Sequence, residues 1–118
     1  MSTPVLRSVA SVTLDGFAPK PTTLTPGQVE ASLALWQGMP GVESGVWEAS
    51  PGTFTATRDG YHEVCVVVAG SVTVTEEGGE PIELAAGDLF VTPAGWRGTW
   101  EVHEALRKVY VTVDVDGR

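Results

Sequence analysis

Short runs of β-branched and apolar residues, separated by turns rich in glycine and proline, dominate this chain from residue 45 onward. Separate strands are predicted at residues 64–68, 71–75, 98–102 and 106–113. Strands that recur at roughly eight-to-twelve-residue spacing with such turns between them are typical of β-sandwiches and barrels. The chain has 118 residues, which is enough to bury the core of a single domain. The sequence therefore predicts one all-β domain.

The apolar run that follows Tyr61 is unusual because both of its faces are apolar. Strand alternation sorts its side chains into two sets, with Tyr61, Glu63, Cys65 and Val67 on one face and His62, Val64, Val66 and Val68 on the other. Both faces must then be covered. We expect one face to line the interior, and the other to pack on another sheet layer or on a second subunit, which favours a homodimer.

The first 45 residues give a weaker pattern. Thr25 and Pro26 resemble the N-cap and first position of a helix, and Val29, Leu33 and Trp36 follow at helical spacing. This spacing predicts one short helix that ends before residue 38. Residues 1–40 are predicted to be an N-terminal extension that packs on a barrel formed by residues 41–118, within one domain.

Composition excludes some partners and suggests a location. The formal net charge is −8, and the clusters of lysine and arginine that nucleic-acid phosphates require are absent. An acidic surface also disfavours docking on anionic membranes, and no apolar run is long enough to cross a bilayer. Cys65 is the only cysteine, so no intrachain disulfide can form. With no secretory signal pattern at residues 1–7, we expect a cytoplasmic protein.

Two glycine-centred motifs resemble those of the cupin superfamily, which are written G-x5-H-x-H-x3,4-E-x6-G and G-x5-P-x-G-x2-H-x3-N. Glu63 followed by Gly70 matches the end of the first motif, and Gly87 followed by Pro93-Ala94-Gly95 matches the start of the second. Residues 40–113 look like the small single-domain cupins related to (S)-ureidoglycine aminohydrolase and to the ethanolamine-utilisation cupins. The resemblance implies a jelly-roll β-barrel.

The histidines that hold a metal in many cupins have no counterpart in these motifs. The H-x-H positions fall on Thr57 and Asp59, or on Ala56 and Arg58 if the longer gap applies. The histidine of the second motif falls on Gly98, and Val102 stands in place of the asparagine. Transition metals in proteins usually need several ligands, with imidazole prominent. We therefore expect no metal cofactor, and Glu63 and Asp59 are the candidate ligands if one binds.

The candidate site consists of inward-facing polar and aromatic side chains. Glu63 lies in an apolar strand, so it is expected either to form an ion pair with Lys108 or to face a polar cavity with a raised pKa suited to proton transfer. The catalytic candidates are Glu63, Lys108 and Tyr110. The candidates for contacting a ligand are Tyr61, Trp47, Trp96, Trp100 and Cys65.

Three functional hypotheses follow from these residues. The first is a barrel that binds a small polar metabolite, with acid–base chemistry in which Glu63 moves a proton while Lys108 and Tyr110 hold an anionic or carbonyl group. The second is a metal-dependent cupin enzyme of aminohydrolase, isomerase or dioxygenase type. The third is a non-catalytic dimeric module. Fold alone does not choose among them.

Overall fold

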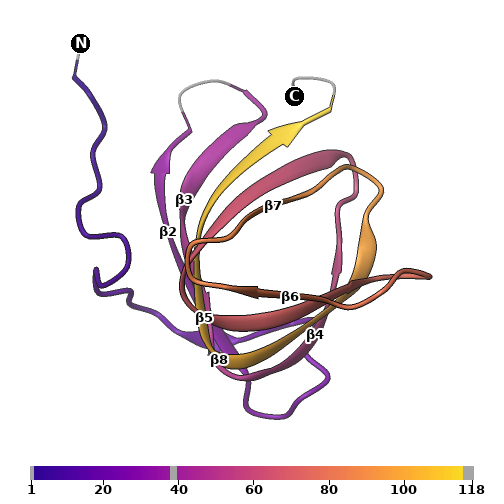
Figure 1. Ribbon diagram of the computed structural model, residues 1–118. Coiled ribbons are helices and arrows are strands. Elements are labelled where there is room, and N and C mark those ends of the chain that lie inside the picture. Colours follow the sequence, from indigo (N-terminus) through magenta and orange to yellow (C-terminus); the bar gives the residue numbers. More distant parts are fainter. Residues whose placement is uncertain (1, 38–39, 116–118) are drawn as a thin grey trace.

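The computed structural model describes residues 2–37 and 40–115, and within these ranges the chain forms strands and no helix. The strands are β1 (Ala18–Pro19), β2 (Val29–Trp36), β3 (Val42–Ala49), β4 (Gly52–Thr57), β5 (Tyr61–Glu76), β6 (Ile82–Ala85), β7 (Leu89–Thr92) and β8 (Arg97–Asp114). They join one sheet that curls around an interior (Figure 1). The predicted all-β class is confirmed. The described residues offer no helix that could span a membrane.

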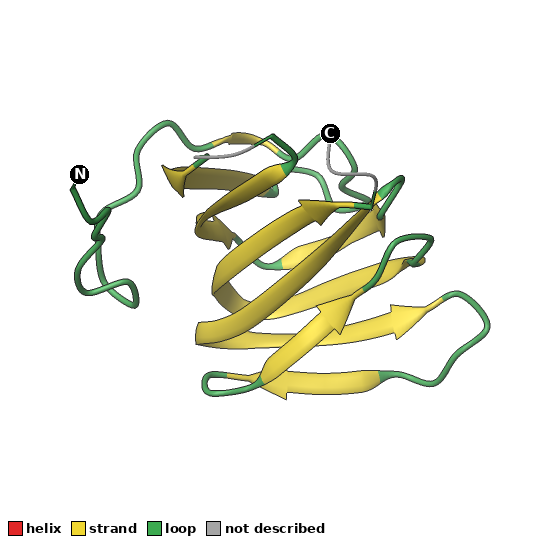
Figure 2. Ribbon diagram, turned by 90° about the horizontal axis from the view of Figure 1, so that it is seen from above, coloured by secondary structure: helices red, strands yellow, loops and turns green. Residues whose placement is uncertain are grey.

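Two long strands, β5 and β8, organise the sheet because each changes partners along its length. The second half of β8 pairs with β3 and its first half with β4, whereas β5 pairs first with β7 and then with β6. β5 and β8 also pair with each other from end to end. Neighbouring strands lie side by side across the molecule (Figure 2). The N-terminal segment, residues 2–17, runs along one side of them. The two strands predicted at 64–68 and 71–75 are therefore one strand, β5. Those predicted at 98–102 and 106–113 are likewise one strand, β8.

The corner of the barrel lies where β5 and β8 bend together. The register between the two strands shifts between Val67 and Val72 on β5. Gly70 lies within this bulge with φ +84°, and a Cβ atom there would collide with the backbone carbonyl of Ala105. Only glycine adopts this conformation readily and leaves room for so close a backbone approach. The bulge therefore lets two long strands fold back over the interior.

The helix predicted after Thr25 is wrong. Thr25 and Gln28 instead close a turn in which Gln28 N donates to Thr25 O at 3.3 Å, with Gly27 at φ +85°. Proline followed by glycine suits such a turn. The following residues form β2, which pairs with β3 from Glu30 onward. Val29, Ala31, Leu33 and Leu35 also alternate with period two, as a strand requires, and pairing with β3 decides in favour of the strand.

The interior is filled by an aromatic and aliphatic core around Trp100, which is fully buried. A second, smaller cluster lies on the outside of the sheet, where Leu14 and Val9 of the N-terminal segment cover Val46 and Val109. Arg107 holds that segment in place by donating hydrogen bonds to the carbonyl oxygens of Val9 and Val12 and by pairing with Glu48. The residues of the inner core are Phe54, Ala56, Cys65, Val67, Val72, Val74, Trp96, Trp100, Val102, Leu106 and Tyr110.

Candidate functional site

Strand alternation turns a group of polar side chains toward one end of the barrel interior. Lys108, Tyr110 and Thr112 occupy alternate positions on β8 and face the same cavity. On the neighbouring strand β5, Glu63 is the direct partner of Thr112, and Cys65 is the direct partner of Tyr110. The two strands therefore bring polar groups together across their shared ladder.

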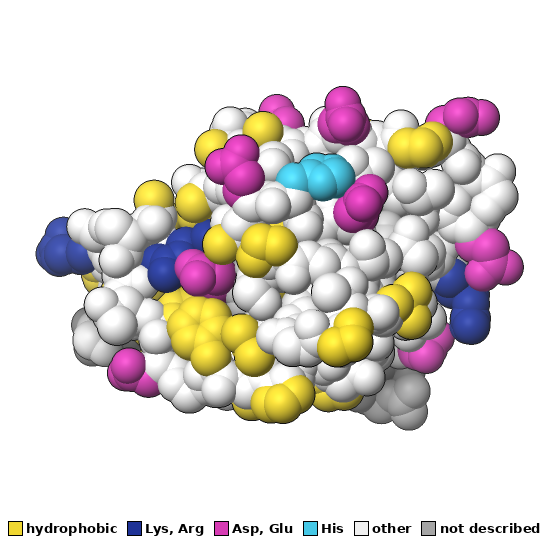
Figure 3. Space-filling view, turned by 90° about the horizontal axis from the view of Figure 1, so that it is seen from below, with side chains coloured by type: hydrophobic (Ala, Val, Ile, Leu, Met, Phe, Trp, Pro, Cys, Tyr) yellow, Lys and Arg dark blue, Asp and Glu magenta, His cyan; other side chains and the backbone are white. Residues whose placement is uncertain are grey.

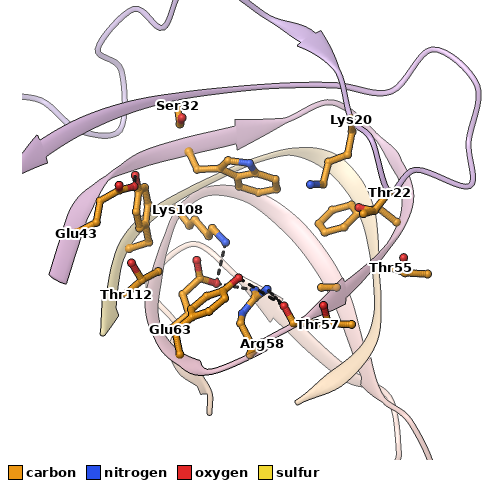
Figure 4. Close-up of a pocket in the computed structure, with 15 residues that line it drawn as sticks. Lys20, Thr22, Ser32, Glu43, Thr55, Thr57, Arg58, Glu63, Lys108 and Thr112 are labelled. Carbon is orange, nitrogen blue, oxygen red and sulfur yellow. Dashed lines mark hydrogen bonds and ion pairs between the residues drawn. The ribbon is translucent and has the colours of Figure 1, made fainter. Parts of the chain in front are cut away.

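Glu63 lies at the centre of a buried cluster of three charged side chains. Its Oε1 atom accepts hydrogen bonds from Arg58 Nη2 at 2.7 Å and from Lys108 Nζ at 3.0 Å (Figure 4). Arg58 also donates through Nε to Thr92 Oγ1 at 2.9 Å. Arg58, Glu63 and Lys108 are 7%, 7% and 5% exposed, so all three charges are removed from bulk water. The predicted ion pair between Glu63 and Lys108 is present.

The environment of Glu63 keeps its carboxylate ionised. Burial alone would raise the pKa of Glu63, but the positive charges of Lys108 and Arg58, with hydrogen bonds from Lys108 and Cys65, bring the pKa below its ordinary value. The alternative prediction of a raised pKa suited to proton transfer is therefore wrong. One cause is Arg58, a second cation bound to the same carboxylate oxygen as Lys108.

Aromatic rings enclose the cations of this cluster. Lys108 Nζ lies 4.5 Å from the ring centroid of Trp47 and 4.4 Å from that of Trp100. The guanidinium carbon of Arg58 lies 5.7 Å from the rings of both Trp100 and Tyr61. Cations are attracted to aromatic faces, most strongly where water is excluded. The rings thus hold the two cations in fixed positions at the floor of a cavity.

The cavity above this cluster has a volume of about 380 Å³ and mixes aromatic, threonine and charged walls. Figure 4 shows its labelled polar side chains converging from several strands. Such a volume suits a small metabolite, at the low end of the usual range for ligand pockets. The lining residues are Lys20, Thr22, Ser32, Glu43, Trp47, Phe54, Thr55, Ala56, Thr57, Arg58, Tyr61, Glu63, Lys108, Tyr110 and Thr112.

Two further sets of polar contacts involve residues of the cavity wall. Tyr110 donates its hydroxyl proton to Glu43 Oε2 at 2.7 Å. Burial, together with this bond to Glu43, raises the pKa of Tyr110 above its ordinary value, so the phenol keeps its proton. Glu30 Oε1 accepts from Lys20 Nζ at 3.0 Å and from Trp47 Nε1 at 2.9 Å. Lys20, from the N-terminal part of the chain, is thereby held against the cavity mouth.

The structure places the predicted site residues in two groups. Those that line the cavity are Glu63, Lys108, Tyr110, Tyr61 and Trp47, and those that lie outside its lining, packed in the inner core, are Trp96, Trp100 and Cys65. Burial, the largest cause, raises the pKa of the Cys65 thiol to about 12. Cys65 therefore remains a neutral thiol beside the cluster.

Arg58 is the functional residue that sequence analysis missed. The sequence pattern alone indicates a strand at residues 53–57 followed by a bend at Arg58, Asp59 and Gly60. In the structure Phe54, Ala56 and Arg58 are buried, whereas Thr57 and Asp59 are exposed. The period-two alternation that buries Phe54 and Ala56 continues one step past the end of β4, and extending it would have placed Arg58 inside. Because Ala56 and Arg58 face the interior and Thr57 and Asp59 do not, the longer gap of the first motif applies. The two H-x-H positions are then Ala56 and Arg58.

The donor set on the cavity floor does not fit a metal ion. The carboxylate on the floor, Glu63, is already bound to two cations, which would repel a third, and Glu43 on the wall is hydrogen-bonded to Tyr110. Asp59, the other suggested ligand, is exposed and does not line the cavity. Within residues 2–37 and 40–115, no three histidine, cysteine, aspartate or glutamate side chains lie close enough together to share a metal ion.

Comparisons with known proteins agree with this architecture. The EutQ protein of Clostridium difficile is 24% identical, with a TM-score of 0.66, over 80% of this chain and 69% of that one. A putative ethanolamine utilization protein Q of Salmonella typhimurium is 22% identical, with a TM-score of 0.67, over 95% and 93%. A DUF861 family protein of Thermotoga maritima is 32% identical, with a TM-score of 0.52, over 63% and 77%.

The family assignment follows from the sequence as well as from the fold. No functionally curated protein matches the chain. The family model for the EutQ-like cupin domain matches residues 32–110, which include the Glu63 cluster and the strands that carry it. This chain belongs to the family of EutQ-like cupin domains.

Proposed function

We propose that this cupin binds a small polar metabolite in its barrel and does so without a metal ion. The observation that carries the proposal is the buried group of Arg58, Glu63 and Lys108 at the floor of an aromatic-walled cavity of about 380 Å³. Fixed charged groups inside an enclosed cavity orient a ligand, and aromatic walls supply contact area. In this proposal Arg58 and Lys108 supply the positive charge that a metal supplies elsewhere in the superfamily.

The proposal favours binding over proton transfer by Glu63. A general base works best when its pKa lies near the working pH. The pKa of Glu63 is instead lowered, and two of its hydrogen-bond donors are cations. Tyr110 donates its one hydroxyl hydrogen bond to Glu43, so it faces the ligand as a neutral phenol oxygen that accepts a hydrogen bond. Lys108 is the hydrogen-bond donor to the ligand, through its ammonium protons.

The test is a ligand-observed NMR screen of matched pairs, each a small carboxylate and its primary amide, from acetate and acetamide to benzoate and benzamide. Ser32 lies at the mouth of the cavity on an exposed part of β2, so Ser32→Trp fills the entrance without disturbing the cluster. Leu33→Trp, at the next exposed position on the opposite face of β2, is the matched control. We expect binding to the wild type and to Leu33→Trp, and its loss in Ser32→Trp. Failure of every compound to bind, or binding that Ser32→Trp leaves intact, would overturn the proposal.

We further propose that a second copy of the chain covers the outer apolar face of β7, β5 and β8. Val64 on β5 is the direct partner of Val91 on β7 and of Val111 on β8, and the three are 37%, 52% and 36% exposed. Leu89 and Val113 extend this face at either end. A continuous apolar patch of this kind on a small domain usually marks an interaction site.

Sedimentation equilibrium tests the dimer. We expect a dimer at micromolar concentration and a monomer for Val91→Lys, which places a charge beside Val64 on the most exposed of the three valines. A wild-type monomer would overturn the proposal.

We also propose a cytoplasmic location. It is supported by the lone, buried Cys65, which has no cysteine partner in the chain.

A further inference from the structure

The cavity floor carries more positive than negative charge. Arg58 and Lys108 share a single carboxylate, Glu63, so the buried cluster has one positive charge in excess. On the wall above it, Lys20 is paired with Glu30, and Glu43 contributes a negative charge whose hydrogen-bond partner is the neutral Tyr110 hydroxyl. An uncompensated charge removed from water is costly, and a bound counter-ion relieves that cost.

This excess runs against the composition of the chain. The formal net charge of the protein is −8, and acidic side chains are spread over the face seen from below, with lysine and arginine toward its left and right edges (Figure 3). The net charge of the cluster at Glu63 is therefore positive, whereas the net charge of the whole protein is negative. A local reversal of charge inside a cavity indicates a ligand of the opposite sign.

Hydrogen-bond donors also exceed acceptors in this region. Lys108 Nζ carries three protons, and one oxygen, Glu63 Oε1, accepts from it. An ionised carboxylate accepts hydrogen bonds and donates none, so it matches a site with spare donors.

From the charge and donor excess together, we infer that the cavity binds a small carboxylate with a single negative charge, its carboxylate group against Lys108 and Arg58. The inference rests on the proposed function and names the class of its ligand. A second negative charge would meet Glu43, whose carboxylate lines the same cavity beside Tyr110. The wall therefore selects a monoanion over a dianion.

The test measures dissociation constants for benzoate, benzamide and the dianion phthalate in a series of charge variants. Lys108→Met removes the excess charge while keeping the ion pair between Arg58 and Glu63 and the length of the buried stem. We expect it to weaken benzoate binding by roughly tenfold or more, with benzamide unaffected. Glu63→Gln leaves both cations unpaired, and we expect it to strengthen benzoate binding. Arg97→Gln makes the same change in net charge as Lys108→Met, and Glu101→Gln the same change as Glu63→Gln. Both controls lie at exposed positions of β8 and should leave binding unchanged.

Each outcome decides between the inference and the proposed function. Benzamide binding as tightly as benzoate, or benzoate binding that Lys108→Met does not weaken, would overturn the carboxylate inference while leaving a ligand-binding barrel. Tighter binding of phthalate than of benzoate would overturn the preference for a monoanion. Absence of binding across the whole screen of acids and amides would overturn the proposed function itself. If Glu63→Gln does not fold, Lys108→Met carries the test, because its remaining pair is neutral.

Discussion

Ala56 and Gly98 lie directly opposite each other in the ladder between β4 and β8. With the longer gap of the first cupin motif, both positions are ones where metal-binding members carry histidine. The space that a side chain at position 98 would occupy is filled, because a Cβ atom on Gly98 would lie 2.7 Å from Cη2 of Trp96 and would collide with the carbonyl oxygen of Thr75. The packing around Gly98 therefore leaves no room for an imidazole at this position.

Gly98→Ala is predicted to lower the free energy of unfolding by about 3 kcal/mol, because neither the backbone of β5 nor the buried ring of Trp96 can yield easily. Gly79→Ala is the matched control: its Cβ atom would lie no closer than 3.3 Å to Glu76 O, in an exposed turn. We expect the control to cost less than about 1 kcal/mol. Urea denaturation of the two variants gives the comparison, and equal losses would show that position 98 is not closely packed.

Glu63→Gln is predicted to lower the free energy of unfolding at neutral pH by about 3–5 kcal/mol, since Arg58 and Lys108 lose the charge that compensates them. The pKa of Glu63 is lower in the folded chain than its ordinary value of 4.5. Its contribution to stability is therefore present above pH 4.5 and is lost as the pH falls through the folded pKa.

Urea denaturation of the wild type and Glu63→Gln across this pH range tests the linkage. The two proteins should converge in stability at acid pH, where the wild-type carboxyl is protonated. Glu101→Gln, at an exposed position, should show no such convergence. A difference between wild type and Glu63→Gln that stayed constant down to the lowest accessible pH would contradict the assignment of the cluster.

The sequence was sufficient for the fold class and for one ion pair, because both follow from local alternation. Period two places Glu63 and Lys108 on inward faces, and a carboxylate in an apolar strand needs a partner. The same alternation, extended past Thr57, places Arg58 inside, and its positive charge is one of the causes that lower the pKa of Glu63.

Other features depend on contacts that no local pattern encodes. The bulge at Gly70 joins two predicted strands into β5, and the register shift that allows it is a property of the pairing with β8. The residues after Gln28 satisfy both a helical and a strand spacing, and β3 selects the strand. Which tryptophans reach the cavity is also decided by packing: Trp47 does, whereas Trp100 lies behind Lys108 in the core.

Cys65 is predicted to be unreactive in the folded protein. Its side chain is fully buried, and burial raises the pKa of its thiol to about 12, so the reactive thiolate is scarce at pH 8. Reaction with a chromogenic disulfide should be slow in native buffer and rapid in urea. Fast labelling of the native protein would show that the region around Glu63 opens to solvent.

Arg107→Gln is predicted to release the N-terminal segment from the outside of the barrel. Arg107 donates to Val9 O at 3.1 Å, also donates to Val12 O, and pairs with Glu48 at 2.8 Å. Without these bonds the segment keeps the small apolar cluster around Leu14 as its described contact with the sheet, so chymotrypsin should cleave near Phe17 several-fold faster than in the wild type. Arg97→Gln removes an exposed arginine of the same strand and should leave the rate unchanged. Mass spectrometry of timed digests identifies the cut, and equal rates in both variants would mean that apolar contacts alone hold the segment.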